Sequence, residues 1–337
     1  MTVDGPEAIA EAVGRLRAGG LVAFPTETVY GLGADALNTD AVMRVFAAKG
    51  RPSENPLIVH VSGVEMARRV VREFNPAAER LARALWPGPV TIVVEKAACV
   101  PDAVTAGGPT VAVRCPDHPL ALALIEAFGG PLVGPSANPS GYISPTTAGH
   151  VARHFEPGEV LVLDGGACRA GLESTVVDLT ADVARVLRRG VVGADELAEA
   201  LGERVEDAGS IVEPDGGGTI ATSPGLVGPH YRPRARVVVV GSMTEIDGAL
   251  EGVRSAVVLS PPGTPATVPP QHASLPMPGG ARAYAAELYA ALREADELSP
   301  GVIVVALPGI ASAVGGADAG DAAVWAAVRE RLARASA

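Results

Sequence analysis

Two cations flank a glycine in the stretch that starts at Lys49 and reads KGRPSENPL. Glycine lets the backbone approach a ligand closely, lysine supplies a compact charge, and arginine supplies a planar fork that fits phosphate oxygens. Cations also occur at helix C-termini for a structural reason, because they interact favourably with the helix dipole. In this chain, however, lysine is rare: the 27 basic residues include two lysines, Lys49 and Lys96. We therefore interpret Lys49 and Arg51 as phosphate-binding residues.

Small polar side chains follow several apolar, strand-like runs. The stretch PTETVYGLG starts at Pro25, directly after the apolar run 21–24, and SANPSG starts at Ser136, after an apolar run at 131–134. A third stretch, ESTVVD, starts at Glu173. Open α/β sheets bind ligands at the ends of their strands, so these groups are candidates for holding a ribose, a phosphate or hydrated Mg²⁺. Each stretch taken alone also fits a capped turn.

Two arginines end strand-like runs of their own. Arg114 follows the apolar residues 111–113, and the run at 184–187 leads into Arg188 and Arg189. Arginines that emerge from neighbouring strand ends can clamp a carboxylate or a phosphate. Taken singly, each is compatible with an ordinary surface charge.

Three familiar binding patterns are absent or incomplete. No Gly-Lys-Ser/Thr occurs, which excludes a Walker-type P-loop. Residues 31–36 match GxGxxA, but the first glycine lies too far beyond the preceding strand and the next strand carries no ribose-binding acid, so we interpret them as a structural turn. His150 and His154 have the spacing of one helix face without the glutamate of a zinc protease, and we expect them on a surface helix.

The composition indicates a soluble protein of two domains. A chain of 337 residues with 48% hydrophobic content exceeds one typical core. A net charge of −11 opposes direct binding of nucleic acid, which needs a basic face. Cys99, Cys115 and Cys168 form no CxxC pair, and the chain shows neither a signal-peptide pattern nor an apolar stretch long enough to cross a bilayer. We expect no membrane association and a cytoplasmic location.

Residues 1–207 alternate helix-like and strand-like segments, sometimes with short turns between strands, and so predict an α/β domain with a twisted mixed sheet. Helices are expected at 6–18, 39–49 and 117–128, and strands at 21–24, 57–61, 90–95, 110–114, 132–134, 160–163, 175–179 and 184–187.

Residues 208–236 are rich in Gly, Pro and Ser and predict a linker. Residues 237–337 predict a small, parallel, Rossmann-like C-terminal domain, with a surface loop at 261–278. Its strands are expected at 237–240, 256–259 and 302–305, and its helices at 280–297 and 321–335.

Together and in this order, the motifs resemble the YrdC-like threonylcarbamoyl-AMP synthase family in its long, two-domain form. The matching stretches are PTETVYGLG, KGRPSENPL, WPGPVT, VAVRCPDHP, GPSANPSG, ESTVVD, and a late SPG followed by HYRP. They cover residues 20–235 densely and the C-terminal part loosely. The resemblance implies the mixed sheet of that family, a linker that folds over the active site, and a nucleotidyltransferase. Its reaction would join L-threonine, bicarbonate and ATP into threonylcarbamoyl-AMP and pyrophosphate, for the threonylcarbamoyladenosine modification of tRNA.

The resemblance also implies the site residues. Lys49 and Arg51 would be the catalytic cations on the triphosphate. ATP would be bound by Lys49, Arg51, Asn55, Ser136, Asn138, Ser144, Arg188 and Tyr231. Threonine would be bound by Thr26, Thr28, Tyr30, His60, Arg114 and Ser174. Mg²⁺ would enter with ATP, no metal-ligand set is assigned to the protein, and tRNA would be reached only indirectly, through a downstream threonylcarbamoyl transferase.

The chain departs from the family pattern in two places. The linker reads SPGLVGPHY from Ser223, where the family usually carries Met and a basic residue after SPG, and the usual Arg-Pro-Gly appears as Arg188-Arg189-Gly190. The second departure leaves open whether Arg188 or Arg189 faces the site. One alternative is a carbamoyltransferase-type enzyme that makes carbamoyl-adenylate, although this chain has no room for a second catalytic domain. Another is a double-stranded RNA-binding module, which the net charge opposes.

Overall fold

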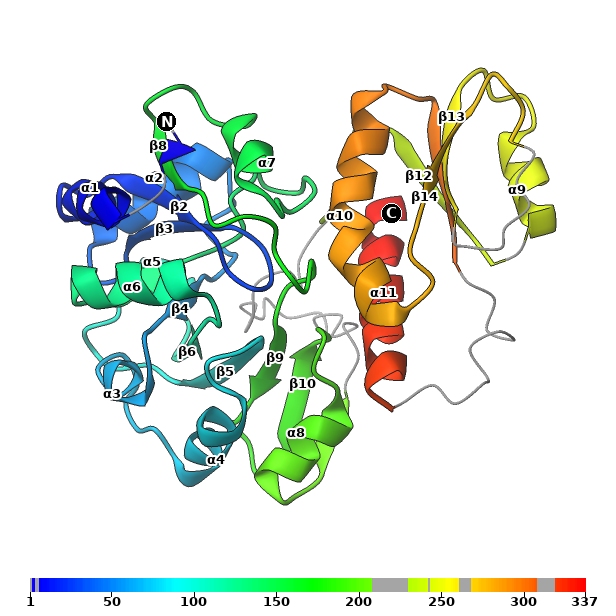
Figure 1. The fold of residues 1–337 in the computed structure, drawn as a ribbon. Helices are drawn as coiled ribbons and strands as arrows, with labels where there is room; N and C mark the ends of the chain where they lie inside the picture. Colours follow the sequence, from blue (N-terminus) through cyan, green and yellow to red (C-terminus); the bar gives the residue numbers. More distant parts are fainter. Residues whose placement is uncertain (1, 4–5, 208–229, 242, 261–267, 308–318) are drawn as a thin grey trace.

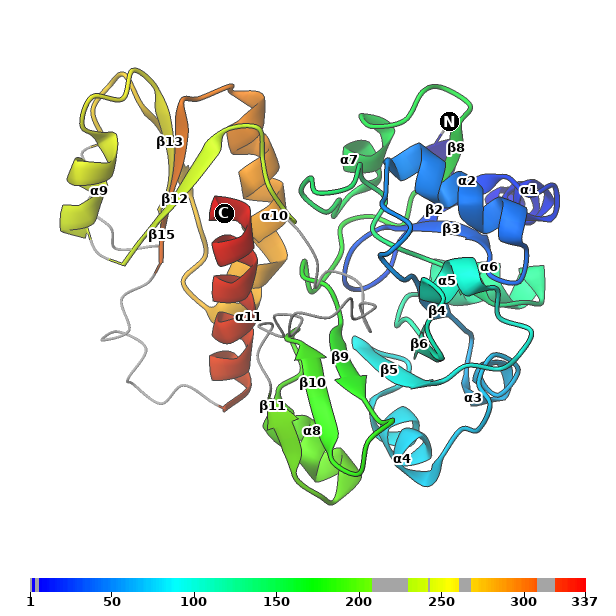
Figure 2. The ribbon, with the colours of Figure 1, turned by 180° about the vertical axis from the view of Figure 1, so that it is seen from behind.

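Among the residues that it describes, the computed structural model contains two β-sheets, each with its own helices (Figures 1 and 2). It describes residues 2–3, 6–207, 230–241, 243–260, 268–307 and 319–337. Residues 208–229 of the predicted linker therefore lie outside the described residues. Among the helices that are described, none is long and apolar enough to cross a membrane.

The larger sheet has 11 strands in the order β1-β8-β2-β3-β7-β4-β6-β5-β9-β10-β11. They are β1 (Thr2–Val3), β2 (Leu21–Phe24), β3 (Gly31–Asp35), β4 (Ile58–His60), β5 (Val90–Glu95), β6 (Thr110–Arg114), β7 (Leu132–Val133), β8 (Val160–Leu163), β9 (Thr175–Asp178), β10 (Ala184–Arg188) and β11 (Val205–Asp207). Parallel and antiparallel neighbours are interspersed: β4, for example, pairs parallel with β6 and antiparallel with β7. The predicted mixed sheet is confirmed.

Helices cover both faces of the larger sheet. In β2, Val22 and Phe24 pack under α1 (Pro6–Arg17) and α6 (Pro119–Phe128). Leu21 and Ala23 belong to the core on the other face, together with α2 (Thr39–Lys49). Successive strand side chains point to opposite faces, so an apolar strand such as β2 needs cover on both sides. The remaining helices of this part are α3 (Val64–Ala67), α4 (Pro76–Leu85), α5 (Asp102–Thr105), α7 (Ala148–Ala152) and α8 (Ala194–Leu201).

Local sequence signals fix both ends of α2, the helix that leads into the KGRPSENPL stretch. At its N-terminus the Asn38 side chain accepts hydrogen bonds from the amides of Asp40 and Ala41. At its C-terminus Gly50 adopts a left-handed conformation with φ of 56°, which glycine reaches without strain. The chain therefore turns sharply after Lys49, and the segment with Arg51 leads toward β4.

The smaller sheet is entirely parallel, in the order β12-β15-β13-β14. Its strands are β12 (Arg236–Val240), β13 (Ala256–Ser260), β14 (Ala273–Pro276) and β15 (Val302–Ala306). Helix α9 (Met243–Leu250) covers one face, while α10 (Ala281–Glu297) and α11 (Ala319–Ser336) cover the other and lie between the two sheets (Figures 1 and 2). The predicted parallel C-terminal sheet is confirmed.

Apolar residues from both parts of the chain form one core beneath α10 and α11. Val29, Ile143 and Leu172 come from loops beside the larger sheet, and they cluster with Leu288 and Tyr289 of α10. The two helices are thus buried on both sides, by their own sheet and by the first 207 residues. This packing brings C-terminal side chains close to the strand ends of the larger sheet.

Three local expectations are wrong. Residues 31–35 are not a turn but the buried strand β3, whose glycines leave room for the Phe24 ring: a Cβ on Gly31 would lie 3.1 Å from that ring. The stretch 261–278 is not all surface loop, because residues 273–276 form the edge strand β14, while residues 261–267 lie outside the described ones. His150 and His154 do not share the face of a surface helix, because α7 ends at Ala152; His154 Nε2 instead lies 2.7 Å from Arg293 Nη1 of α10. Local sequence patterns do not show which side chains from distant parts of the chain will pack against a residue.

Candidate active site

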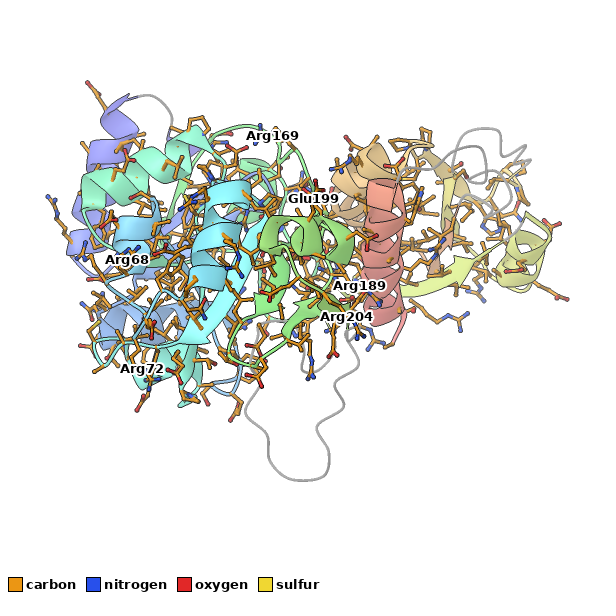
Figure 3. The ribbon with its side chains drawn as sticks, turned by 90° about the horizontal axis from the view of Figure 1, so that it is seen from below. Arg68, Arg72, Arg169, Arg189, Glu199 and Arg204 are labelled. Carbon is orange, nitrogen blue, oxygen red and sulfur yellow. The ribbon has the colours of Figure 1, made fainter. Side chains whose placement is uncertain are left out.

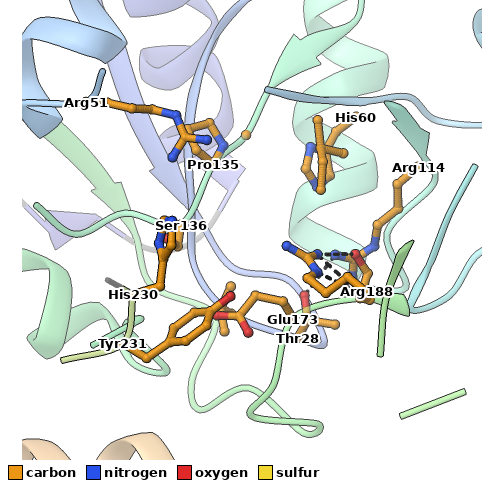
Figure 4. Close-up of a pocket in the computed structure, with 14 residues that line it drawn as sticks. Thr28, Arg51, His60, Arg114, Pro135, Ser136, Glu173, Arg188, His230 and Tyr231 are labelled. Atoms are coloured by element: carbon orange, nitrogen blue, oxygen red, sulfur yellow. Dashed lines mark hydrogen bonds between the residues drawn. The ribbon is translucent and has the colours of Figure 1, made fainter. Parts of the chain in front are cut away.

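A cavity of about 540 Å³ opens where several strands of the larger sheet end (Figure 4). That figure counts all of the empty space in the pocket, including the part that is open to solvent. The cavity is lined by Thr28, Val29, Arg51, Ile58, His60, Arg114, Gly134, Pro135, Ser136, Glu173, Ser174, Arg188, His230 and Tyr231. Eight of these were predicted as site residues, so stretches that are far apart in sequence converge on one space.

Strand register explains much of this convergence. β4 and β6 are parallel neighbours, and their register places His60 beside Arg114. β5 and β9 are also parallel, with Val90 beside Thr175, so Ser174 precedes β9 at the same edge. An isolated bridge between Gly31 and Ser136 joins the PTETVYGLG stretch to the SANPSG stretch. The polar residues thus gather at one end of the sheet.

Three buried or half-buried arginines give the cavity its positive character. Arg114 Nη2 lies 2.7 Å from Glu27 Oε2, and Arg114 Nη1 donates a hydrogen bond of 2.9 Å to Thr28 Oγ1. Arg188 donates from Nε and Nη2 to the Ser174 carbonyl, at 3.1 and 3.0 Å. Both guanidinium groups are therefore held in fixed orientations at the cavity wall (Figure 4).

Arg51 is held by neutral acceptors. Its Nε and Nη2 donate to the carbonyl oxygens of Asn55 and Pro56, at 3.2 and 2.9 Å. Burial lowers the pKa of Arg51 to about 10, which still leaves the guanidinium charged at neutral pH. Carbonyl oxygens do not cancel that charge, so Arg51 is available to an anionic ligand.

His60 is a neutral imidazole in this site. Burial, reinforced by the neighbouring charge of Arg114, lowers its pKa to about 3. Gly134 lies against the ring, since a Cβ at that position would be 2.6 Å from His60 Nδ1. The ring can thus offer or accept a hydrogen bond without adding a charge.

Lys49 does not line the cavity. Its ammonium group is buried and donates hydrogen bonds of 2.5 Å to the carbonyl oxygens of Ser136 and Asn138. Burial and the charge of Arg51 lower its pKa well below the ordinary value. Lys49 therefore ties the end of α2 to the SANPSG loop, beside Arg51 and Ser136, which do face the cavity.

Five further predicted residues lie near the cavity without lining it, and each has a structural contact. Thr26 Oγ1 donates to the carbonyl of Val29 at 2.6 Å, and Tyr30 OH donates to the carbonyl of Gly166 at 2.8 Å. Ser144 Oγ donates to Glu173 Oε1 at 2.6 Å. The Asn138 amide donates to the carbonyls of Pro139 and Tyr142, and the carbonyl of Asn55 accepts from Arg51.

Sequence reasoning missed several residues that shape the site. Glu173 and His230 line the cavity, and Glu27 pairs with Arg114 behind it. All three stand inside quoted motifs, next to Ser174, Tyr231 and Thr28. For the two glutamates, the signal that was available is an acidic residue followed directly by a hydroxyl residue next to an apolar run: PTET follows the run 21–24, and EST precedes Val176 and Val177.

The structure answers the question of which arginine faces the site. Arg188 is buried in the cavity wall, whereas Arg189, which is labelled in Figure 3, has its Nε 2.9 Å from Asp207 Oδ2 on β11. Gly190 follows them, and a Cβ there would lie 2.4 Å from the Thr175 amide nitrogen. The glycine therefore lets the chain after β10 pass close against the start of β9.

Two family models match almost the whole chain. Residues 15–190 match the model described as "Telomere recombination", and residues 192–337 match the one described as "Threonylcarbamoyl-AMP synthase, C-terminal domain". The chain belongs to the threonylcarbamoyl-AMP synthase family. The predicted family is thereby confirmed.

Named relatives agree with this assignment. The chain is 47% identical over 232 residues to a threonylcarbamoyl-AMP synthase of Pyrococcus abyssi and 43% identical over 235 residues to one of Bacillus subtilis. Each match covers 68% of this chain and 66% of the relative, so the matched part of the chain spans about two thirds of the length of these curated relatives. A solved structure titled "Crystal structure of P. abyssi Sua5 complexed with L-threonine" matches with a TM-score of 0.85 and 38% identity, covering 100% of this chain and 97% of that one.

The cavity suits an anionic ligand with several hydrogen-bonding groups. Three guanidinium groups attract phosphate or carboxylate oxygens, while hydroxyls and a neutral imidazole can orient uncharged polar groups. Within the described parts of the chain, no group of three His, Cys, Asp or Glu residues could hold a metal ion. Because its guanidinium groups are held in fixed orientations, the site offers positioning and charge neutralisation.

Proposed function

We propose that this chain is an L-threonylcarbamoyladenylate synthase, which condenses L-threonine, bicarbonate and ATP to threonylcarbamoyl-AMP and pyrophosphate. The observation that carries the proposal is the single cavity in which three arginines stand beside Thr28, His60 and Ser174. Family membership supports it, as does the likeness to a solved relative whose title names bound L-threonine.

We assign the Arg114 side of the cavity to threonine. Arg114 and the hydroxyls of Thr28 and Ser174 suit an α-carboxylate, which favours bidentate guanidinium contacts and short hydroxyl hydrogen bonds. His60 lies beside Arg114 in the strand register and carries no charge, so it can orient the amine or the side-chain hydroxyl of the ligand. Thr26 and Tyr30 support this side through their backbone contacts.

We assign the Arg51 side to ATP. Arg51 and Arg188 supply positive charge for phosphate oxygens, and Ser136 adds a hydroxyl. Lys49, Asn55, Asn138 and Ser144 shape the loops that carry these groups. Mg²⁺ would arrive with ATP as part of the substrate, held mainly by phosphate oxygens.

The chemistry needs alignment more than a covalent partner. The threonine amine adds to carbon dioxide from bicarbonate and loses a proton, which gives a carbamate. A carbamate oxygen then attacks the α-phosphorus, and the bond to the bridging oxygen breaks to release pyrophosphate. Charge builds up on phosphate oxygens during this step, and the fixed guanidinium groups of Arg51 and Arg188 are suited to stabilise it.

Tyr231 and His230 complete the cavity from the linker side. Both are buried, so they can exclude water that would hydrolyse the mixed anhydride. We further propose that tRNA is reached only indirectly, through a downstream transferase, because the net charge of −11 opposes direct binding. The unpaired cysteines Cys99, Cys115 and Cys168 fit a reducing compartment, which supports a cytoplasmic location.

The comparisons favour this function over the two alternatives. The named relatives are threonylcarbamoyl-AMP synthases. The second family model matches residues 192–337, where a carbamoyltransferase-type enzyme would need a different domain. The cavity does not favour RNA binding, because three arginines that converge on one small space suit a compact anion.

The test is mass spectrometry of the nucleotide products after mixing the protein with ATP, Mg²⁺, L-threonine and bicarbonate. We expect threonylcarbamoyl-AMP and one pyrophosphate per adenylate, with neither product when threonine or bicarbonate is omitted. An adenylate that forms from carbamoyl phosphate and ATP without threonine would instead support the carbamoyl-adenylate alternative. ATP left unchanged under all these conditions would refute the proposal.

A further inference from the structure

The buried carboxylate of Glu173 is held by two side chains from the C-terminal domain. Glu173 Oε2 accepts hydrogen bonds from Tyr289 OH at 2.9 Å and from Arg331 Nε at 2.8 Å. Its other oxygen, Oε1, accepts from Ser144 Oγ at 2.6 Å. The charge of Arg331 helps to hold the pKa of Glu173 below its ordinary value despite burial. Glu173 is therefore an ionised carboxylate with both oxygens occupied, which makes it a poor proton acceptor.

The same two C-terminal residues contact other parts of the site. Arg331 Nη2 donates to the carbonyl of Arg189 at 2.7 Å, one residue from the cavity-lining Arg188. The Arg331 guanidinium lies 5.3 Å from the centre of the Tyr231 ring, and Tyr289 stacks on that ring with centroids 5.5 Å apart. Arg331 itself is 1% exposed. One buried cluster thus joins α10 and α11 to three elements of the cavity wall.

Tyr231 shows that this cluster constrains the backbone as well. Its φ is 63°, in the left-handed region that residues with a side chain rarely adopt. Such a conformation persists where the surroundings over-determine it, and here the ring stacks on Tyr289 and contacts the Arg331 guanidinium. Figure 4 shows the Tyr231 ring beside Glu173 at the edge of the cavity.

We propose that Tyr289 and Arg331 are positioning residues that complete the nucleotide side of the active site from the C-terminal domain. Their contacts reach Ser144 through Glu173, Arg188 through the Arg189 carbonyl, and Tyr231 directly. Ser144 and Arg188 belong to the side assigned to ATP, and Tyr231 is among the residues for which the family resemblance implies contact with ATP. Neither residue has a contact with Thr28, His60 or Arg114 among the described interactions. The inference rests on the proposed function for the identity of the ligands, although the geometry stands without it.

The decisive variant is Tyr289→Phe, because it removes one hydroxyl and keeps the ring that stacks on Tyr231. The chain offers a matched control in Tyr284→Phe. Tyr284 lies on the same helix, is equally buried, and its hydroxyl has no hydrogen-bond partner among the described residues. A second pair is Arg331→Met, with Arg329→Met as the control at an exposed position of α11.

The measurements are ATP binding by calorimetry without threonine, the KM values for ATP and for threonine, and the thermal unfolding midpoint. We expect Tyr289→Phe to weaken ATP binding and raise the KM for ATP by about 10-fold, the factor that one lost hydrogen bond to a charged group typically produces. The KM for threonine should stay within about twofold, and Tyr284→Phe should resemble the wild type. Arg331→Met should have the larger effect, because it removes the charge as well as the hydrogen bonds to Glu173, to Glu330 and to the Arg189 carbonyl.

Two outcomes would overturn the inference. One is that Tyr289→Phe and Tyr284→Phe bind ATP alike. The other is that both KM values rise by the same factor together with a lowered unfolding midpoint, which would reveal a merely structural role. If the wild type made a different product, the proposed function would fail, whereas the ATP-binding comparison would still decide the role of Tyr289. If Arg331→Met did not fold, Tyr289→Phe would decide alone.

Discussion

Replacing Glu27 with glutamine should destabilise the fold by about 3–5 kcal/mol, because the buried guanidinium of Arg114 then loses its counter-charge. In the structure, Arg114 Nη2 lies 2.7 Å from Glu27 Oε2, and the two side chains are 4% and 5% exposed. Both side chains are almost fully shielded from solvent, so water compensates little for the missing carboxylate. Glutamine keeps the size of the side chain, so the loss isolates the charge. For a domain of roughly 200 residues that unfolds cooperatively, a loss of that size should lower the unfolding midpoint by about 6–20 °C.

Asp117→Asn is the matched control for this experiment. Arg169 Nη2 lies 2.6 Å from Asp117 Oδ2, so the pair is as close as the buried one, but its side chains are 68% and 51% exposed. Solvent and salt screen such a pair, and its loss should cost less than about 1 kcal/mol. Both variants remove one carboxylate charge, and burial is the main difference between the two sites.

The assay is chemical denaturation followed by circular dichroism, with the free energy of unfolding compared among the wild type and the two variants. A double variant, Glu27→Gln with Arg114→Met, should recover much of the lost stability, because it removes the uncompensated charge. If Glu27→Gln cost no more than Asp117→Asn, the claim that the pair is a buried, mutually dependent unit would be refuted.

Three further predictions separate the roles of individual residues. Arg51→Ala should lower pyrophosphate release at least 100-fold while the unfolding midpoint stays near that of the wild type, because its contacts are to local carbonyls; a normal rate would remove Arg51 from the site. Lys49→Ala should lower both activity and the unfolding midpoint, since its ammonium group joins α2 to the SANPSG loop; loss of activity alone would indicate direct contact with ATP instead. For His60, the folded state lowers the pKa from 6.5 to about 3, so the unfolded chain binds the proton first as the pH falls. The contribution of His60 to stability should therefore be complete above about pH 6.5 and be lost progressively toward about pH 3, and a His60→Gln variant that shows the same decline in its unfolding midpoint would contradict this assignment.

The strand-like runs and the ends of several helices were predictable because they depend on local signals. The run at 21–24 and the Gly50 end of α2 appear where the sequence places them. Strand β3 was not predictable in the same way, since its two glycines resemble a turn. They are needed because the Phe24 ring lies against that backbone, and that contact exists only after β2 and β3 pair.

By itself the sequence determined which chemical groups the site would contain. Hydroxyls and cations that follow apolar runs must emerge at strand ends, and the motifs that hold them also identify the family. The tertiary structure alone decided which of those groups face the cavity: Arg51 faces it while Lys49 ties the end of α2 to the SANPSG loop, and Arg188 rather than Arg189 forms its wall. It also brought Tyr289 and Arg331 to Glu173 from more than a hundred residues away. The physical reason is that local spacing fixes where a side chain leaves its own strand or helix, whereas the packing of distant elements fixes what that side chain meets.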